Sequence, residues 1–226
     1  MREALRLIFA LDPAVFEVMW RSLQVTASAL VISAVMGVPV GTWLALTRFR
    51  GQRLLNALIY TGMGLPPVVV GLVVYLFLSN SGPFGDLSWL FTIKAMVVAQ
   101  VIIATPLVIG VTMSSVRAVD PALRVQLRAL GATRGQATTA TLVEARFGVI
   151  VGLVAGFGSI ISEVGAVMLV GGNIDGRTRV LTTAVVLETR RGNFDVALAL
   201  GIILLALSFV ANLIMVLGQG KLAESS

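Results

Sequence analysis

The amino-acid sequence predicts an all-α integral membrane protein with five transmembrane helices and a helical cytoplasmic segment. Of the 226 residues, 57% are hydrophobic and only 12% are charged, which is about half the charged fraction of a soluble domain. Five stretches with one charged residue at most are long enough to cross about 30 Å of hydrocarbon as helices. Their apolar residues run continuously and do not alternate, which indicates helices and not barrel strands.

The five spans are predicted between successive clusters of charged residues. The second span is long enough to include an outer loop at 79–85, and the fourth contains a single charge, Glu163. Before the first span, Glu3, Asp12 and Glu17 exclude a cleavable signal. The spacing of the apolar residues in 1–20 predicts a short interfacial helix there. The spans are 22–47, 54–79, 95–116, 147–171 and 196–218, followed by a cytoplasmic tail at 218–226.

The distribution of Lys and Arg predicts the orientation of the spans. With the N-terminus outside, nine of the 17 basic residues lie inside and eight outside, a difference too small to orient the chain. Short loops carry the most weight, and the tight loop 48–53 holds three arginines. We therefore expect the N-terminus outside and the C-terminus in the cytoplasm, with net charges of +6 inside and +1 outside.

The composition excludes several classes of function. The chain contains neither Cys nor His, which removes thiolate chemistry, most zinc and haem sites, and His-based catalysis. No Gly-x4-Gly-Lys-Ser/Thr stretch is present, so ATP hydrolysis by the P-loop route is excluded. Because the positive charge belongs to a membrane protein and lies on one face, it indicates lipid headgroups and not nucleic acid. The chain is therefore predicted not to be an enzyme and to hold no metal or cofactor.

Residues 117–146 form a basic loop that is predicted to contain two short helices broken near Gly131. The first helix carries the apolar side chains of Val125, Leu127 and Leu130. A solvated connector is one interpretation of this loop. A connector would not need an apolar stripe that ends at a glycine, where another surface can approach closely. A docking element for a cytoplasmic partner is the alternative.

The Ala-Leu-Gly-Ala-Thr stretch at 129–133 resembles the cytoplasmic loop motif of ABC importer permeases, which is Glu-Ala-Ala, three residues, then Gly. Val-Gln-Leu at 125–127 stands at the Glu-Ala-Ala positions, and Val-Glu at 143–144 stands at a later Leu-Pro. In that family the loop forms a coupling helix that seats in a groove of the ATPase. The resemblance therefore assigns ATPase coupling to Arg124, Leu127, Arg128, Ala129, Leu130, Gly131, Ala132 and Thr133.

Three longer stretches, 61–71, 162–174 and 179–193, resemble the molybdate and tungstate branch of the same family. The resemblance covers nearly all of 20–217 and implies the type I ABC importer permease fold, with 21–217 as the transmembrane domain and 117–146 as the coupling loop. It also implies that the second and fourth spans line the translocation pore.

Local chemistry supports a path through these two spans. Pro66 and Pro67 must interrupt the second span, because proline lacks a donor and clashes with the preceding turn. This break can be a packing bend or a gate. Glu163 is costly near hydrocarbon and should face the bundle, form an ion pair with a basic residue of 171–195, or act in a gate. The pore and gate candidates are Pro66, Pro67, Glu163, Gly165, Gly172, Asn173, Arg177 and Arg179.

Two further features suggest contacts. Gly148, Gly152 and Gly156 form a face of small residues, which is typical of close helix packing in lipid.

The loop 171–195 offers amide, hydroxyl and guanidinium donors that are predicted to lack fixed acceptors and could contact a tetrahedral dianion. A surface loop that contacts a binding protein, or folds over the bundle, is the alternative. This loop is either external or partly re-entrant.

These expectations combine into one predicted function. The chain would be the permease of an ATP-driven tungstate importer in a prokaryotic inner membrane, and two copies would form the pore through their glycine-rich faces. An ATPase dimer would bind ATP and Mg²⁺, and an extracytoplasmic binding protein would deliver the anion. A permease for molybdate, sulfate or another anion is the alternative within the class. A secondary transporter or channel is the alternative from another class, although these usually have more intramembrane ionisable groups and internal repeats.

Overall fold

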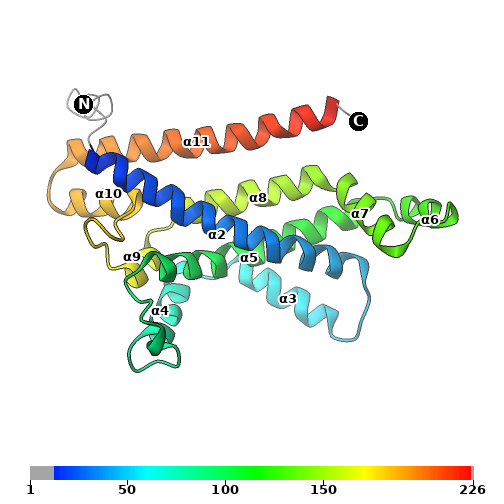
Figure 1. Ribbon diagram of the computed structural model, residues 1–226, viewed down its shortest axis with the longest axis horizontal. Coiled ribbons are helices and arrows are strands. Elements are labelled where there is room, and N and C mark those ends of the chain that lie inside the picture. Colours follow the sequence, from blue (N-terminus) through cyan, green and yellow to red (C-terminus); the bar gives the residue numbers. More distant parts are fainter. Residues whose placement is uncertain (1–12, 225–226) are drawn as a thin grey trace.

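The structure is a computed structural model that describes residues 13–224, and in this range it consists of α-helices and one short 3-10 helix. The longest helices run side by side along one axis (Figure 1). In chain order the elements are α2 (Pro13–Leu46), α3 (Gln52–Met63), α4 (Pro67–Leu78), η1 (Gly85–Leu87), α5 (Ile93–Ala118), α6 (Pro121–Ala129), α7 (Arg134–Glu144), α8 (Arg146–Ile161), α9 (Gly165–Gly171), α10 (Leu181–Arg190) and α11 (Phe194–Glu224).

Helix α5 lies at the centre of the fold and packs against α2, α3, α4, α8 and α9. Its central residues Met96, Ala99 and Ala104 are fully buried, and Val25 and Ala29 of α2 pack into the same core. Small side chains allow these helix backbones to approach closely, which is the usual packing mode in lipid. A second core joins α10 and α11 through Leu181, Ala184 and Leu200.

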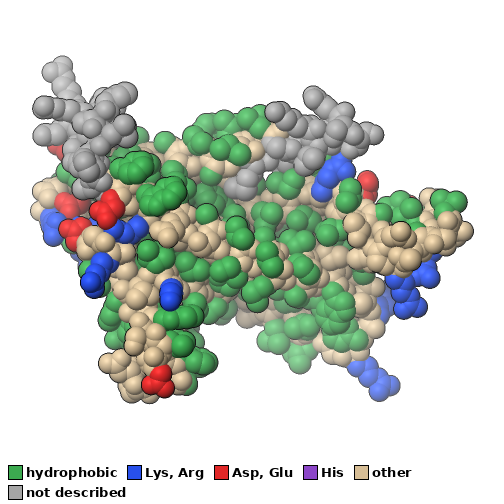
Figure 2. Space-filling model, in the orientation of Figure 1, with side chains coloured by type: hydrophobic (Ala, Val, Ile, Leu, Met, Phe, Trp, Pro, Cys, Tyr) green, Lys and Arg blue, Asp and Glu red, His purple; other side chains and the backbone are tan. Residues whose placement is uncertain are grey.

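Apolar side chains surround the middle of the molecule, whereas charged side chains gather at its two ends (Figure 2). Three helical segments are long and apolar enough to cross a membrane: Val15–Leu46, Ile93–Ala118 and Phe194–Ile214. Two bent helix pairs, α3 with α4 and α7 with α8, raise the number of candidate spans to five if each pair counts as one. The all-α membrane architecture is therefore confirmed, and the number of crossings is between three and five.

The first span differs from the prediction at its N-terminal side. Helix α2 is continuous from Pro13 to Leu46, so residues 13–20 belong to it and do not form a separate interfacial helix. Residues 1–12 of that predicted helix lie outside the described residues. The predicted span begins at residue 22, because Arg21 is charged. In the structure Arg21 lies within α2, is only 8% exposed and ion-pairs with Glu17 on the preceding turn. Its guanidinium also donates to the carbonyl of Gly176, at 2.6 Å.

The second span is interrupted where the two prolines predict it. Helices α3 and α4 meet at a bend of 100°. Pro66 is the N-cap of α4 and Pro67 its first residue, the position where a missing N–H leaves no helical bond unmade. The predicted span 54–79 is therefore broken at the prolines into two short helices at an angle.

The predicted fourth span, 147–171, is also not one helix. Helix α8 ends at Ile161 and α9 begins at Gly165. The side chains at the break replace the missing helical hydrogen bonds: the Ser162 hydroxyl donates to the carbonyl of Gly158 at 2.8 Å, and the Glu163 carboxylate accepts from the N–H of Ala166 at 2.8 Å. Hydropathy continues through this break, so the sequence pattern did not reveal it.

Two boundaries near the C-terminus also differ from the predictions. The predicted loop 171–195 contains helix α10, which packs against α11. At its start the Thr183 hydroxyl accepts from the N–H of Val180 at 3.1 Å. Helix α11 continues to Glu224 and so includes most of the predicted tail; residues 225–226 lie outside the described residues.

Candidate gate and docking arm

The α3–α4 break of the predicted second span and the α8–α9 break of the predicted fourth span lie close to each other. A Cβ on Gly165, the first residue of α9, would lie 2.5 Å from Cγ2 of Val68 in α4. One turn further along α4, a Cβ on Gly71 would lie 2.5 Å from Cα of Ala166. At Gly71 the neighbour is main chain, so only glycine permits the approach, whereas at Gly165 the neighbour is the Val68 side chain. The structure therefore brings Pro66, Pro67, Glu163 and Gly165 together, although about 100 residues of chain separate the two pairs.

Glu163 acts locally at this junction. One carboxylate oxygen accepts from the N–H of Ala166, and the main-chain carbonyl of Glu163 accepts from the Thr182 hydroxyl at 2.9 Å. Among the described residues no basic side chain lies within salt-bridge distance of Glu163. The expected ion pair with the 171–195 segment is therefore wrong, because the carboxylate caps the start of α9.

Gln100 was missed by the sequence analysis. It lies in the middle of α5, is 3% exposed, and donates its amide N–H to the carbonyl of Ile160 at 2.9 Å. This bond holds the last turn of α8 beside the Glu163 break. An uncharged amide inside a predicted span was the available signal, since polar side chains within membranes usually serve a specific contact.

The segment after α9 is folded around one buried threonine. The Thr178 hydroxyl donates to the carbonyl of Gly171 at 2.6 Å and accepts from the N–H of Ile174 at 2.9 Å. Gly172 and Asn173 both adopt left-handed backbone angles, with φ of 71° and 50°. The two residues reverse the chain direction at the end of α9.

Most donors in this segment already have acceptors. Arg179 pairs with Asp175 at 2.8 Å, and the Thr182 and Thr183 hydroxyls bond to main-chain groups. The expectation of donors without fixed acceptors is therefore wrong for these residues. Arg177 is exposed, and within the described part of the chain no carboxylate lies within salt-bridge distance of it.

The three glycines of α8 lie against α5 of the same chain. A Cβ on Gly148 would overlap the Ser115 side chain, one on Gly152 would lie 3.0 Å from Val111 Cβ, and one on Gly156 would lie 3.4 Å from Val108 Cγ2. The glycine face is thus covered within the protomer. The expectation that two copies meet through this face is wrong, because α5 already occupies it.

Helices α6 and α7 form an arm that projects from the bundle at the end opposite α10 (Figure 1). The Asp120 carboxylate caps α6 by accepting from the N–H of Ala122 at 2.8 Å. At the tip, Gly131 has a φ of 93°, and the N–H groups of Gly131 and Ala132 bond back to Arg128 and Leu127. This is the Schellman arrangement, which needs a left-handed residue. Thr133 then caps α7 in a capping box with Gln136.

The arm leaves its apolar side chains exposed. No residue of α6 is buried, Val125 is 68% exposed, and Leu130 at the tip is 86% exposed. The predicted coupling residues lie together along the second half of α6 and around the tip, and all are exposed or half-buried. The rest of the chain buries little of the apolar surface of α6, so this surface is suited to contact with another molecule.

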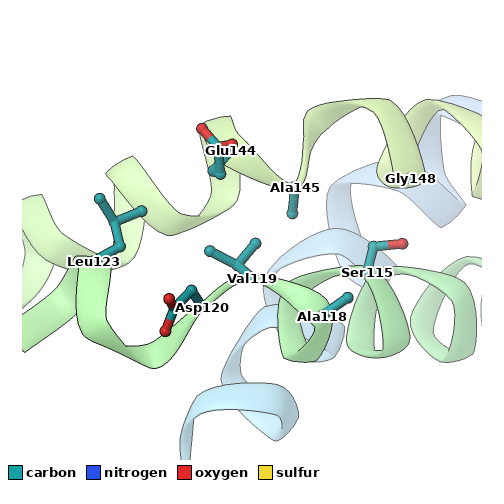
Figure 3. Close-up of a pocket in the computed structure, with 8 residues that line it drawn as sticks. All are labelled: Ser115, Ala118, Val119, Asp120, Leu123, Glu144, Ala145 and Gly148. Carbon is teal, nitrogen blue, oxygen red and sulfur yellow. The ribbon is translucent and has the colours of Figure 1, made fainter.

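At the root of the arm lies an open hollow of about 650 Å³ between the α5–α6 and α7–α8 joints (Figure 3). Asp120 and Glu144 border it on the two sides, and Ser115 and Gly148 form its inner end. Helices α7 and α8 meet here at 63°. The arm therefore joins the bundle through two joints that face each other across the hollow. Across the described residues, no three Asp or Glu side chains are grouped as a metal site would require.

Comparison with known families gives a match over most of the chain. The model of the family described as binding-protein-dependent transport system inner membrane component matches residues 37–222. A probable anion ABC transporter permease of Haloferax volcanii is 43% identical over 196 residues, covering 84% of each chain. The tungstate uptake system permease TupB of Peptoclostridium acidaminophilum is 37% identical, covering 93% of this chain and 92% of its own. The molybdenum permease ModB of Escherichia coli K12 is 30% identical, covering 85% and 88%.

Solved structures share the fold at low sequence identity. A chain of a bacterial alginate ABC transporter has a TM-score of 0.75 at 20% identity, covering 90% of this chain and 77% of that one. A chain of the MetNI methionine ABC transporter has a TM-score of 0.71 at 18% identity, covering 94% and 96%. The predicted helical importer architecture is confirmed by these two structures.

Proposed function

The chain belongs to the family of binding-protein-dependent transport system inner membrane components, and within it we propose a permease for tungstate or a related tetrahedral oxyanion. As a member of this family it is a multi-pass membrane protein and a transport subunit without catalytic activity of its own. The support for an oxyanion comes from the relatives, whose names specify an anion, tungstate and molybdenum. Molybdate is the alternative substrate, since both anions are tetrahedral dianions.

The exposed arm carries the proposal of ATP-driven transport. The chain has no P-loop, so the energy must enter through contact with a separate ATPase, which would bind ATP and Mg²⁺. The tip around Leu130 and Gly131 is the surface that we assign to this contact. An ATPase contact at the tip requires the arm to be cytoplasmic, and the C-terminus would then lie on the same side. The α10 end and the N-terminus would be external, where a binding protein would deliver the anion to residues 171–195.

A continuous route of chain joins the arm to the candidate gate. Helix α8 starts at the α7–α8 joint beside the hollow and ends at Ile161, next to the Glu163 break. Its glycines pack closely against the side chains of Ser115, Val111 and Val108 of α5, so the two helices should move together. A rotation of the arm would therefore shift the junction of α4 and α9. We propose that this junction, in each of two copies of the chain, opens and closes the path.

The function is tested by uptake in membrane vesicles that contain the permease, its ATPase and its binding protein. ATP-dependent accumulation of tungstate that molybdate inhibits only partly would support tungstate. Accumulation of neither anion, with the complex intact, would contradict the proposed substrate class.

The docking surface is tested separately with Leu130→Asp and the matched control Leu130→Met. Because Leu130 is 86% exposed, neither change should alter insertion or thermal stability of the permease. Leu130→Asp should reduce ATPase co-purification at least tenfold, while Leu130→Met should retain it. Unchanged co-purification of the aspartate variant would exclude the tip as the docking surface.

A further inference from the structure

Five arginines surround a cleft between the end of α2 and the root of the arm. Two adjoining cavities of about 380 and 500 Å³ share Leu46, Thr47, Pro121 and Arg124 in their walls. No Asp or Glu lines either cavity. We call the two cavities together the basic cleft; its arginines are Arg48, Arg117, Arg124, Arg128 and Arg134.

The positive charge of the basic cleft is not neutralised by the chain itself. In the described part of the protein, no carboxylate lies within salt-bridge distance of any of the five guanidinium groups. Arg117 lines the cleft and donates to the carbonyl of Leu44 at 3.2 Å. Arginine side chains placed together without acids create a strong local preference for an anion with several acceptor oxygens.

The position of aromatic side chains places the cleft at the surface of the membrane. Trp43 and Phe49 are exposed and stacked, with ring centroids 5.2 Å apart. Trp43 is one helical turn before Leu46 and Thr47, so it lies on the same side of α2 as the cleft wall. Exposed tryptophan is typical of the headgroup level of a bilayer. Leu54 and Leu58 of α3, the helix whose first residue Gln52 lines the cleft, are also exposed.

We infer that the basic cleft binds the phosphate of an anionic phospholipid, with the acyl chains lying along the apolar surface of α2 and α3. Each observation matches one part of such a lipid: the arginines match the phosphate, the aromatic pair the glycerol level, and the apolar helix surface the chains. The inference requires only that the chain lies in a membrane. It does not depend on the transported anion, and its test needs no ATPase, although Arg124 and Arg128 also belong to the predicted coupling residues.

The test measures lipid retention by the full-length permease in detergent, using native mass spectrometry. Phosphatidylglycerol is compared with phosphatidylcholine of the same acyl chains. The variant is Arg48→Gln with Arg124→Gln, which removes one guanidinium from each side of the cleft. The matched control is Arg50→Gln with Arg53→Gln, which removes the same charge from two arginines near Arg48 that line neither cavity. Arg48→Gln alone, at an exposed position, serves if the double variant fails to fold.

The wild-type chain should retain phosphatidylglycerol at least tenfold better than phosphatidylcholine. The cleft variant should lose about tenfold of that retention, and the control should stay within twofold. Equal losses in both variants would overturn the inference, since they would indicate a general charge effect. Displacement of the lipid by millimolar inorganic phosphate would also overturn it, because the cleft would then be a site for a free oxyanion.

Discussion

The two ends of the helical bundle carry similar numbers of basic residues but surround them differently. At the α10 end, Arg21, Arg179 and Arg191 each lie within salt-bridge distance of a carboxylate. At the α6 end, none of the five arginines of the basic cleft does so among the described residues. Figure 2 shows the same contrast, with red and blue mixed at one end and blue predominant at the other.

The two ends therefore differ in how far the chain itself pairs their charged groups. The α10 end pairs three of its arginines internally, and Thr178 and the α10 cap bond its main-chain groups, whereas Arg177 stays exposed. The α6 end leaves all five guanidinium groups of the basic cleft without a carboxylate in the described residues, and its leucine tip is exposed. Substitutions at the α10 end should therefore change the stability of the chain, whereas substitutions at the α6 end should change its associations.

The strongest effect is expected from Thr178→Val at the α10 end. The valine keeps the buried shape but removes both hydrogen bonds of the hydroxyl, so the Gly171 carbonyl and the Ile174 N–H lose their partner. We expect a loss of about 2–3 kcal/mol of unfolding free energy, measured by thermal or denaturant unfolding in detergent. Thr189→Val is the control, because the Thr189 hydroxyl is exposed and bonds only within its own helix. Equal stability of both variants would contradict the internal closure of this end.

Arg21→Gln should produce the next largest effect. The change removes the ion pair with Glu17 and the charge-assisted bond to the Gly176 carbonyl, which joins α2 to the segment after α9. A loss of about 1.5–2 kcal/mol is expected, and faster proteolysis within 171–180 should accompany it. If stability is unchanged, the contact between α2 and this segment does not hold the α10 end together.

Gly131→Ala should have a smaller effect, confined to the arm. The left-handed backbone angle of Gly131 costs an alanine about 1 kcal/mol, although space around the position is open. The matched control is Gly135→Ala inside α7, where alanine should be neutral or slightly stabilising. Hydrogen exchange of residues 121–144 measures the difference, and faster exchange only in Gly131→Ala is the expected result.

The smallest effect is expected from Arg128→Gln. This exposed arginine has no carboxylate within salt-bridge distance in the described residues, so its removal should change unfolding free energy by less than about 0.5 kcal/mol. Comparing it with Arg21→Gln in the same unfolding assay tests the contrast between the ends directly. A loss as large as that of Arg21→Gln would show that the basic cleft is stabilised from within the chain.

Local patterns allowed part of the fold and site to be predicted. Pro66 and Pro67 indicated the α3–α4 break because each proline lacks an N–H and its ring clashes with the preceding turn, although the single prolines Pro39 and Pro106 lie inside α2 and α5. Gly131 indicated the turn of the arm, although its role is a left-handed backbone angle. The break at Glu163 was not predicted, because the apolar sequence continues on both sides of it. The main-chain groups freed at the break are hydrogen-bonded by Ser162 and Glu163, which the hydropathy pattern does not reveal.

Other features depended on residues far apart in the chain. The Lys and Arg count of nine against eight could not separate the ends, since a count ignores whether each charge has a partner. The contact of Arg21 with Gly176 spans 155 residues, and the glycines of α8 could have met a second copy as easily as α5. Sequence spacing holds no information about either choice.

By itself the sequence determined that the chain lies in a membrane as helices, where the second span breaks, where the arm turns, and which family it belongs to. These properties depend on hydropathy, on proline and glycine geometry and on residue identity, which act over a few neighbouring residues. Only the tertiary structure decided that the two breaks form one junction, that one end is closed and that the other is left basic and open. Those properties depend on which segments meet in space, and each pairing excludes the alternatives that the sequence leaves equally possible.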